Sequence, residues 1–337
     1  MTTESINLQN LEHYLHSRLP DYPGPTSLEK FNSGQSNPTY LLQSGQHHYV
    51  LRRKPPGVLL ASAHAVDREF RLLSALHGST VPVARPWLLC RDEAVIGSMF
   101  YLMSYEPGDI FWDPALPEIS KHQRQDYYHA LIDTLAALHD LDYVALGLQD
   151  FGKPGSYYER QLTRWTAQYE ASATHEIPAM NQLITWLHQA LPADDGQCSL
   201  IHGDYRLDNV IFHPGEARIK AVLDWELATL GHPLADLAYY CMALRLPGND
   251  QIRGLGGQHR TALGIPEEEA LIQRYCTARG LDQVSHWEFC MAFSFFRLAA
   301  ILQGVYKRGL DGNASNERAI RMGGMVEPLA EMAIASL

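Results

Sequence analysis

One stretch of the chain, residues 198–240, combines strand-like apolar runs with polar side chains at fixed spacing. In chain order its landmarks are the apolar run Ser199–Ile201, the tripeptide His202-Gly203-Asp204, Asn209, the apolar run Val210–Phe212, a turn at Pro214-Gly215, an alternating run over 218–223, and Asp224. Two such runs joined by a Pro-Gly turn predict a β-hairpin. We therefore expect Asp204, Asn209 and Asp224 to lie around one small volume at its mouth.

Three oxygen-bearing side chains around one volume suit the transfer of a phosphoryl group from a metal-bound nucleotide. This reaction needs hard oxygen ligands for Mg²⁺ and a carboxylate that orients the acceptor hydroxyl and takes its proton. An aspartate, an asparagine five residues later and a strand-borne aspartate form the arrangement described for kinases. Each residue alone could belong to an ordinary turn, but the ordered set, which continues through Gly231-His232-Pro233 and Asp236, favours kinase chemistry.

The string His202-Gly203-Asp204, with Asn209 and a downstream Asp224-Trp225, resembles the aminoglycoside phosphotransferase and choline kinase superfamily of small-molecule kinases. Gly203 replaces the arginine of the protein-kinase signature, and Glu226 stands where protein kinases have the glycine of Asp-Phe-Gly. The resemblance implies an α+β, two-lobed protein-kinase-like fold: a small N-lobe with an antiparallel sheet plus a helix, and a large, mainly helical C-lobe. It also implies ATP and Mg²⁺ as cofactors, Asp204 as the catalytic base, and Asn209 with Asp224 as metal ligands.

The N-terminal third of the chain supplies candidate nucleotide contacts. Residues 32–39 lie between two strand-like runs, and a hairpin tip there could donate backbone N–H groups to phosphates through Gly34, Ser36 and Asn37. The segment has one glycine where protein kinases have three, so an ordinary turn is the alternative interpretation.

The strand-like run 48–54 contains the cation that a kinase needs for the α- and β-phosphates. Arg52 occupies the position where kinases have lysine, and arginine can bind phosphate in a bidentate manner. Lys54, two residues on, is the fallback candidate, and an edge strand made basic for solubility is the alternative. Glu69, on a helix predicted over 65–76, is the candidate carboxylate that steadies Arg52.

The Pro-Gly pair that follows Ser104, Tyr105 and Glu106 is the best candidate for a domain boundary. The predicted units are a nucleotide-binding lobe over 1–105 and a catalytic and substrate-binding lobe over 106–337, with a hinge at about 103–108. The resemblance implies that the extended backbone of Ser104, Tyr105 and Glu106 pairs with adenine.

Two further residues are predicted to support the catalytic loop. Asp236 lies near the start of a helix predicted over 233–245, where it could accept hydrogen bonds from the loop backbone, and His202 opens the loop itself. His139 ends another periodic helix, 127–139, and we interpret it as a core or capping histidine instead of a catalytic imidazole.

Composition and charge exclude several other classes of protein. The net charge of −11 over 337 residues argues against a nucleic acid or an anionic membrane as the main partner. Five cysteines without a C-x-x-C pair predict free thiols in a reducing compartment. No signal peptide, no apolar run of about eighteen residues and no zinc-binding histidine motif is visible. We therefore expect a cytoplasmic protein with no membrane span and a small-molecule substrate.

The resemblance covers nearly the whole chain and is most specific in five segments. They are GQSNPTYLL, YVLRRKPPG, SAHAVDREFRLL, HGDYRLDNVIF and FRLAAILQGVYKRGLDGNAS. Together these segments are most similar to the phosphotransferase domains that occur fused to, or beside, certain acyl-CoA dehydrogenases. That similarity implies a hydroxyacyl-CoA, in particular a 4-hydroxyacyl-CoA, as phosphoryl acceptor, and a functional link to an acyl-CoA dehydrogenase.

The basic residues of the C-terminal part fit an anionic acceptor. An aminoglycoside is polycationic and needs carboxylates, whereas the candidate acceptor residues here are Arg253, Arg297, Tyr306 and Arg308. Arg297, Gly304 and Arg308 share one face of a predicted helix, and the glycine leaves room for a close approach. A solvated basic helix end is the alternative interpretation.

Three other functions stay open from the sequence. An aminoglycoside or choline kinase would use the same catalytic residues on a different acceptor. A catalytically inactive nucleotide-binding module would explain the departure at Arg52, although Asp204, Asn209 and Asp224 are all present. A metal-dependent phosphohydrolase could use the same carboxylates, but it would need neither a hinge nor a nucleotide loop.

Overall fold

A computed structural model of the chain describes residues 6–31, 37–55, 65–248, 253–312 and 316–337, with the backbone alone for 316–318. The chain divides into two compact units. The first consists of residues 1–110, 144–148 and 208–227, and the second of residues 111–143, 149–207 and 228–337. The first unit therefore contains the predicted hairpin around 210–223 as well as the N-terminal segments.

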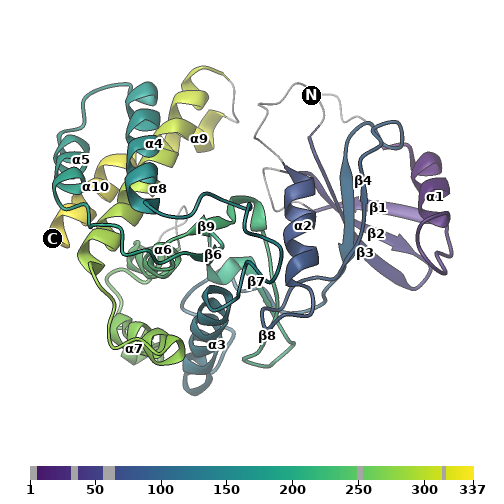
Figure 1. Ribbon diagram of the computed structural model, residues 1–337, viewed down its shortest axis with the longest axis horizontal. Helices are drawn as coiled ribbons and strands as arrows, with labels where there is room; N and C mark the ends of the chain where they lie inside the picture. The colour runs from purple at the N-terminus through teal and green to yellow at the C-terminus, as the bar shows by residue number, and fades with distance from the viewer. Residues whose placement is uncertain (1–5, 32–36, 56–64, 249–252, 313–315) are drawn as a thin grey trace. The chain divides into compact units, whose positions relative to one another are not determined.

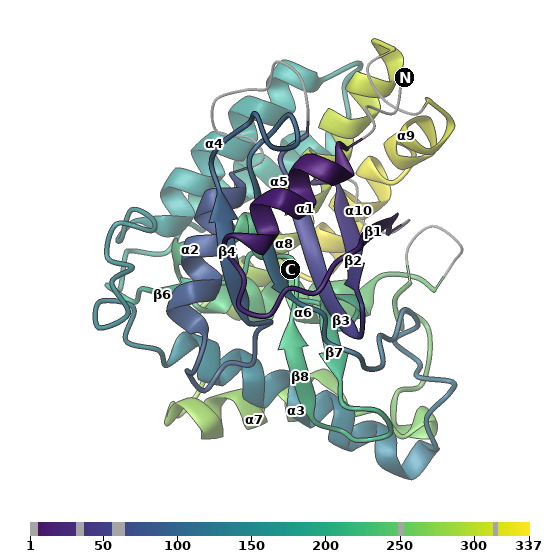
Figure 2. The same cartoon turned by 90° about the vertical axis from the view of Figure 1, so that its right-hand side faces the viewer.

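A five-stranded antiparallel sheet forms the centre of the first unit (Figure 1). Its strands, in spatial order, are β1 (Thr26–Lys30), β2 (Thr39–Ser44), β3 (His47–Arg53), β5 (Phe100–Ser104) and β4 (Pro86–Cys90). Two helices accompany the sheet, α1 (Leu8–His16) and α2 (Val66–Leu76). They lie on opposite faces of it (Figures 1 and 2). The predicted antiparallel sheet with a following helix is confirmed.

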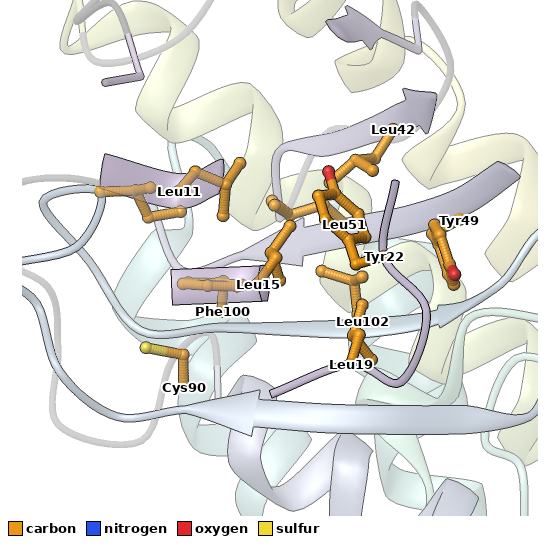
Figure 3. Close-up of a cluster of buried hydrophobic side chains, with 11 residues drawn as sticks. Leu11, Leu15, Leu19, Tyr22, Leu42, Tyr49, Leu51, Cys90, Phe100 and Leu102 are labelled. Carbon is orange, nitrogen blue, oxygen red and sulfur yellow. The ribbon is translucent and has the colours of Figure 1, made fainter. Parts of the chain in front are cut away.

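Side-chain alternation gives the two faces of this sheet different chemistry. Leu51 and Leu102 belong to the buried apolar cluster on the α1 side, together with Leu11 of that helix (Figure 3). Arg52 and Tyr101 are the next residues along the same strands, so their side chains point to the opposite face. That face meets α2, whose Glu69 contacts both of them. One face of the sheet is therefore a hydrocarbon core, and the other holds a buried charge cluster.

The predicted hairpin is present in the first unit, as β7 (Val210–Phe212) and β8 (Ile219–Val222). Short 3-10 turns flank it, η1 (Leu207–Asn209) and η2 (Trp225–Leu227). Asp109 and Phe212 form an isolated β-bridge, with N–H···O bonds of 3.0 and 2.9 Å, that ties the hairpin to the N-terminal segment. Gly108 permits this approach, because a Cβ there would lie 2.2 Å from the Phe212 carbonyl oxygen.

The described part of the second unit is mainly helical, as predicted. Its helices are α3 (Lys121–His139), α4 (Tyr157–Ser172), α5 (Pro178–Gln189), α6 (Leu234–Arg245), α7 (Glu268–Arg279), α8 (Trp287–Leu310), α9 (Asn316–Gly323) and α10 (Val326–Ala335), with a 3-10 turn η3 (Thr261–Leu263). A two-stranded antiparallel sheet joins β6 (Ser199–Ile201) to β9 (Thr229–Gly231). The sequence predicts β6 as a buried strand, but it predicts neither β9 nor the pairing of β9 with β6.

Helix α8 is the central helix of the second unit and packs against α4, α5, α6, α9 and α10 (Figure 1). By length and composition α8 could cross a membrane, but 78% of its apolar window is buried inside the fold. Its apolar side chains therefore serve the protein core. Among the described residues, α8 is the one helix that passes this test of length and composition.

Candidate active site

A buried ion cluster surrounds Arg52 in the first unit. Its guanidinium Nε lies 2.8 Å from Glu69 Oε2, and its Nη2 lies 2.8 Å from Asp224 Oδ1 and 3.5 Å from Glu226 Oε2. The side chains of Arg52 and Glu69 are 12% and 4% exposed, whereas Asp224 keeps 37% of its side-chain surface accessible. One cation therefore joins the α2 glutamate to the aspartate that follows β8.

The branched guanidinium explains how arginine can stand where kinases have lysine. A lysine ammonium is a single point charge, whereas two nitrogens of Arg52 reach carboxylates on two different elements. Burial alone would lower the pKa of Arg52, but Glu69, with Asp224 and Glu226, outweighs burial and raises it. Lys54, the fallback candidate, lies beyond the last residue of β3, and Arg52 is the residue that pairs with Glu69.

Glu69 is held from two further sides. Its Oε1 accepts a hydrogen bond from the Asn37 side-chain amide at 2.8 Å, and its Oε2 accepts one from the Tyr101 hydroxyl at 3.0 Å. Burial raises the pKa of Glu69, while the Arg52 guanidinium and the Tyr101 hydroxyl oppose that rise. Asn37, predicted to contact the nucleotide, is buried with its amide on Glu69. Its side chain therefore orders the partner of Arg52.

Asn209 and Asp224 flank the open end of the β7–β8 hairpin. The Asn209 carbonyl accepts a hydrogen bond of 2.8 Å from the N–H of Leu223, the residue that precedes Asp224. Asp224 has a φ of +60°, a left-handed conformation that non-glycine residues rarely adopt and that occurs often at functional sites. The indole N–H of Trp225 donates to the Val222 carbonyl at 3.0 Å and closes this turn. The hairpin register thus places the two predicted metal ligands at one end, within one unit.

The donor atoms at this end fit a magnesium ion that arrives with a nucleotide. Proteins usually hold Mg²⁺ through one or two carboxylates plus water and substrate phosphates. Asp224 offers a carboxylate whose Oδ1 faces Arg52, which leaves its other oxygen for a metal, and Asn209 offers an amide oxygen. In the described parts of the chain, no group of three or more His, Cys, Asp or Glu side chains could hold a metal ion alone.

The predicted hinge residues continue from the end of β5. The Ser104 N–H donates to the Arg85 carbonyl and the Ser104 hydroxyl accepts from the Arg85 N–H, both at 2.8 Å. Tyr105 is exposed, while the Glu106 carboxylate accepts the Ser104 hydroxyl and lies 3.6 Å from Lys220 Nζ. Because two of these three side chains bind neighbouring residues, the adenine contact stays a prediction about their backbone. The other predicted nucleotide contacts, Gly34 and Ser36, lie outside the described residues.

The loop that contains Asp204 belongs to the second unit and is held by a buried carboxylate. Asp236, in the first turn of α6, accepts the His202 N–H at 2.6 Å through Oδ2 and the Gly203 N–H at 2.8 Å through Oδ1. Burial alone would raise the pKa of Asp236, but the hydrogen bonds from the His139 side chain and the His202 backbone oppose burial, and the pKa is lowered. An ionised Asp236 therefore fixes the two residues that precede Asp204.

His139, at the end of α3, connects Asp236 to α7. Its Nε2 lies 3.4 Å from Asp236 Oδ2, and its Nδ1 lies 2.6 Å from the Tyr275 hydroxyl, which accepts a bond of 3.0 Å from Arg279. Burial lowers the pKa of His139, so its neutral imidazole donates from Nε2 and accepts at Nδ1. His139 is 3% exposed. It is a core residue that orients the carboxylate beneath the loop.

Asp204 itself keeps 21% of its side-chain surface accessible. Its Oδ1 lies 3.4 Å from Arg206 Nε, and its backbone N–H donates to His202 Nδ1 at 3.2 Å. Tyr239 of α6 is a further neighbour: burial raises the pKa of Tyr239, and the charge of Asp204 and a hydrogen bond to it raise that pKa more. No sequence motif marked Arg206 or Tyr239 as a site residue. The signal for Tyr239 was its spacing of three residues from Asp236 on one helix.

Arg297, predicted to contact the acceptor, is buried beneath the same loop. Its Nη2 donates to the Gly203 carbonyl oxygen at 2.9 Å, and the residue is 8% exposed. The guanidinium carbon lies 5.4 Å from the ring centroid of Tyr239 and 5.8 Å from that of Trp165, so aromatic rings share the cation. Arg297 therefore positions the residue next to Asp204.

The remaining predicted acceptor residues are Tyr306 and Arg308, both on α8, and Arg253. Tyr306 packs against α9, where a Cβ on Gly323 would lie 2.5 Å from its ring. Arg253 and Arg308 are exposed. Among the described residues, no hydrogen bond or ion pair joins Arg253, Tyr306 and Arg308 to one another.

Asp204 belongs to the second unit, whereas Asn209 and Asp224 belong to the first. Four residues of chain, 205–208, lie between Asp204 and Asn209.

Comparison of the sequence with known proteins identifies related chains. The model of the phosphotransferase enzyme family matches residues 27–285. Acyl-CoA dehydrogenase family member 10 of Mus musculus is 48% identical over 333 residues, and family member 11 of Homo sapiens is 44% identical over 328 residues. These matches cover 98% and 96% of this chain but 31% and 42% of the relatives. The chain therefore spans less than half the length of these curated relatives.

Solved structures show the same relationship in three dimensions. A crystal structure from Ralstonia eutropha JMP134, provisionally described as an aminoglycoside phosphotransferase, is 44% identical, has a TM-score of 0.90 and covers 98% of both chains. A spectinomycin phosphotransferase solved with ADP and spectinomycin is 14% identical, with a TM-score of 0.64 and 98% coverage of both chains, and shares the fold alone. The predicted kinase-like fold is confirmed. With a family match over residues 27–285 and close relatives at 44–48% identity, this chain belongs to the phosphotransferase enzyme family.

Proposed function

We propose that this phosphotransferase is an ATP-dependent small-molecule kinase that moves the γ-phosphoryl group of MgATP to a substrate hydroxyl. The ion cluster of Arg52, Glu69 and Asp224 is the observation that carries the proposal. A cation paired with a helix glutamate beside a metal-side aspartate is the arrangement that phosphoryl transfer from a nucleotide requires. The fold is also that of a phosphotransferase solved with ADP, which supports a nucleotide as donor.

In this mechanism Asp204 accepts the proton of the acceptor hydroxyl as its oxygen attacks the γ-phosphorus. A base in this role must be accessible and rigidly held. The Asp204 carboxylate is partly exposed, and the residues before it are fixed by Asp236 through two N–H groups and by Arg297 through the Gly203 carbonyl. The loop is therefore fixed from both its N–H and its carbonyl side.

The first unit provides the charges for the phosphate groups. Asn209 and Asp224 would hold Mg²⁺, which neutralises charge on the phosphates when bound. Arg52, oriented by Glu69, stabilises the negative charge that develops during transfer. Glu69 binds the guanidinium through Nε, so its orientation is set before the phosphates bind.

For the acceptor we propose a hydroxyacyl-CoA of the 4-hydroxyacyl type. Relatives at 44–48% identity are named acyl-CoA dehydrogenase family members, and this chain corresponds to 31–42% of their length. A kinase linked to such an enzyme in one polypeptide fits an acyl-CoA substrate. An aminoglycoside acceptor is the second candidate, because a solved relative at 44% identity is provisionally described as such a phosphotransferase. The five cysteines are all free, which supports a reducing compartment such as the cytoplasm.

The test is ADP release from the full chain with MgATP, measured against 4-hydroxyacyl-CoAs, 3-hydroxyacyl-CoAs, choline and aminoglycosides. We expect the 4-hydroxyacyl-CoAs to raise ADP release at least tenfold over the rate without acceptor. Stimulation by aminoglycosides alone would replace the proposed acceptor and keep the kinase. ADP release that no acceptor changes would indicate a phosphohydrolase, and bound nucleotide without turnover would indicate an inactive binding module.

Separate substitutions of Asp204 and Asp224 distinguish the base from the metal ligand. Asp204→Asn removes the proton acceptor, so we expect kcat to fall about 10²–10⁴-fold while MgATP affinity changes less than about threefold. Asp224→Asn removes a metal ligand, so we expect the Mg²⁺ concentration for half-maximal activity to rise at least tenfold. Steady-state kinetics with Mg²⁺ titration measure both effects. Full activity of Asp204→Asn would remove it from the catalytic role.

Arg52→Lys tests the need for a branched cation. Lysine keeps the charge but cannot reach Glu69 and Asp224 with two nitrogens. We expect kcat/KM for ATP to fall about 10- to 100-fold, with the loss in kcat exceeding the change in KM. The matched control is Arg91→Lys, at an exposed arginine paired with Asp67, which should change neither parameter. Equal kinetics in Arg52→Lys and wild type would show that one point charge suffices.

Arg297→Met tests whether this buried cation acts through the catalytic loop. Loss of the bond to the Gly203 carbonyl lets Asp204 shift, and misplacement of about 1 Å can cost about 10²-fold in rate. We expect kcat to fall about 10- to 100-fold with the acceptor KM within about threefold of wild type, and Arg297→Lys to restore part of kcat. A raised acceptor KM at unchanged kcat would instead show that Arg297 binds the acceptor directly.

A further inference from the structure

A groove of about 600 Å³ lies along the start of α4 in the second unit and is rich in cations. Its charged lining residues are Lys153, Glu159, Arg160 and Arg164, and hydroxyl groups of Ser156 and Thr163 also line it. Three cations thus face one carboxylate, in a chain whose net charge is −11. Such a concentration of one sign inside a concave surface attracts ligands of the opposite sign.

The groove cations have no acidic partner among the described residues, unlike several other arginines of the second unit. Arg245, Arg274 and Arg279 each lie 2.6 Å from a carboxylate oxygen. Among the described residues, no carboxylate lies within 4.0 Å of Lys153, Arg160 or Arg164, so none of the three cations forms an ion pair there. An unpaired cation in a groove can bind an external anion without first breaking an internal contact.

Two of the cations are nevertheless held in place by neighbouring groups. Arg160 Nη2 donates to the Lys153 carbonyl oxygen, and the Arg164 guanidinium carbon lies 5.3 Å from the ring centroid of Trp165. Arg160 and Arg164 are four residues apart on α4, so their side chains share one helix face. Preordered cations lose less conformational entropy when a ligand binds.

Trp165 and Arg297 connect the groove to the loop of Asp204. Trp165 contacts Arg164, and the same ring contacts Arg297, whose guanidinium binds the Gly203 carbonyl at 2.9 Å. Burial raises the pKa of Tyr157, while Arg297, Arg160 and Arg164 all act to lower it. Tyr157 is therefore close enough to interact electrostatically with the groove arginines and with the arginine that holds the loop. A ligand seated in the groove would therefore begin beside the loop where Asp204 meets the acceptor hydroxyl.

The same helix face extends toward α8, which runs beside α4 (Figure 1). A Cβ on Gly304 would lie 3.5 Å from the Gln168 amide nitrogen and 3.7 Å from an Arg308 guanidinium nitrogen. Gln168 follows Arg164 by one helical turn, so Arg308 continues the row of cations that begins at Arg160. Cations on two helices thus line one path.

We propose that this groove binds the phosphate groups of the acceptor, specifically the 3′-phosphorylated ADP portion of a CoA thioester. The inference rests on the proposed function, which supplies a CoA acceptor. The thioester arm would run from the groove toward Asp204, and Arg160 and Arg164 would each donate paired N–H groups to phosphate oxygens. Lys153 adds a point charge, and the hydroxyl of Ser156 can donate a further bond.

The experiment measures CoA binding to the full chain by calorimetry, with MgADP at saturation so that CoA cannot occupy the donor site. The variant is Arg160→Gln combined with Arg164→Gln. The matched control is Arg91→Gln combined with Arg218→Gln, which removes two exposed arginines that pair with carboxylates in the first unit. We expect the groove variant to bind CoA at least tenfold more weakly than wild type, and the control within about twofold.

Shortened ligands identify which group the groove recognises. We expect the difference between wild type and the groove variant to shrink from CoA to dephospho-CoA, and again to pantetheine, which has no phosphate diester or ADP. Equal CoA affinity in wild type and variant, or no CoA binding by wild type, would contradict the proposal that the groove binds CoA. A difference in affinity that is the same for all three ligands would also contradict it.

A kinase assay with hydroxyacyl-CoA separates this inference from the proposed acceptor. If groove-dependent CoA binding is found but no hydroxyacyl-CoA is phosphorylated, the result supports the groove as a CoA site and contradicts the proposed acceptor. If hydroxyacyl-CoA is phosphorylated with the same KM by wild type and groove variant, the acceptor stands and the groove fails. We expect phosphorylation together with an acceptor KM that rises at least tenfold in the variant.

Discussion

The buried guanidinium of Arg52 is the interaction on which the first unit depends. It joins residues 52, 69 and 224, which come from a strand, a helix and the end of a hairpin that are far apart in the sequence. Burying charges is costly, and removing one partner of such a cluster leaves an uncompensated charge at a cost of about 3–5 kcal/mol. The cluster therefore couples folding to the proposed function: the charges that hold the hairpin against the sheet are those to which we assign phosphoryl transfer.

In the second unit a different buried carboxylate, Asp236, holds the polar loop in place. Asp236 is 1% exposed and stays ionised because His139 and two backbone N–H groups satisfy its oxygens. Arg297 then holds the Gly203 carbonyl from α8. The loop of Asp204 is therefore fixed by groups that never need to touch the substrate. In the proposed mechanism each unit carries one group of site residues on its own buried polar cluster, and residues 205–208 connect the two groups along the chain.

What the sequence predicted correctly is what local pattern determines. Alternation and a Pro-Gly turn predict the hairpin that brings Asn209 to the same end as Asp224, and helical periodicity places Glu69 on α2. The strand β9 is three residues long and pairs with β6 across almost thirty residues, so it has no local signature. The buried position of Arg297 was not predictable from the sequence, because a charged residue is expected at the surface unless it is paired. Only the fold reveals its carbonyl and aromatic partners.

The net charge of −11 does not by itself disfavour an anionic acceptor, because the charges close to the binding groove matter most. At physiological salt, charges further apart than about 8 Å are largely screened, so distant carboxylates matter little at a given groove. Arg160 and Arg164, about 6 Å apart along α4 by the helical rise, lie within that distance and act on one ligand together. Local pairing decides whether a cation is available, and these arginines have no acidic partner among the described residues, whereas Arg245 and Arg274 do. If the proposed acceptor is correct, its recognition therefore depends on which charges the fold leaves unpaired near the loop of Asp204.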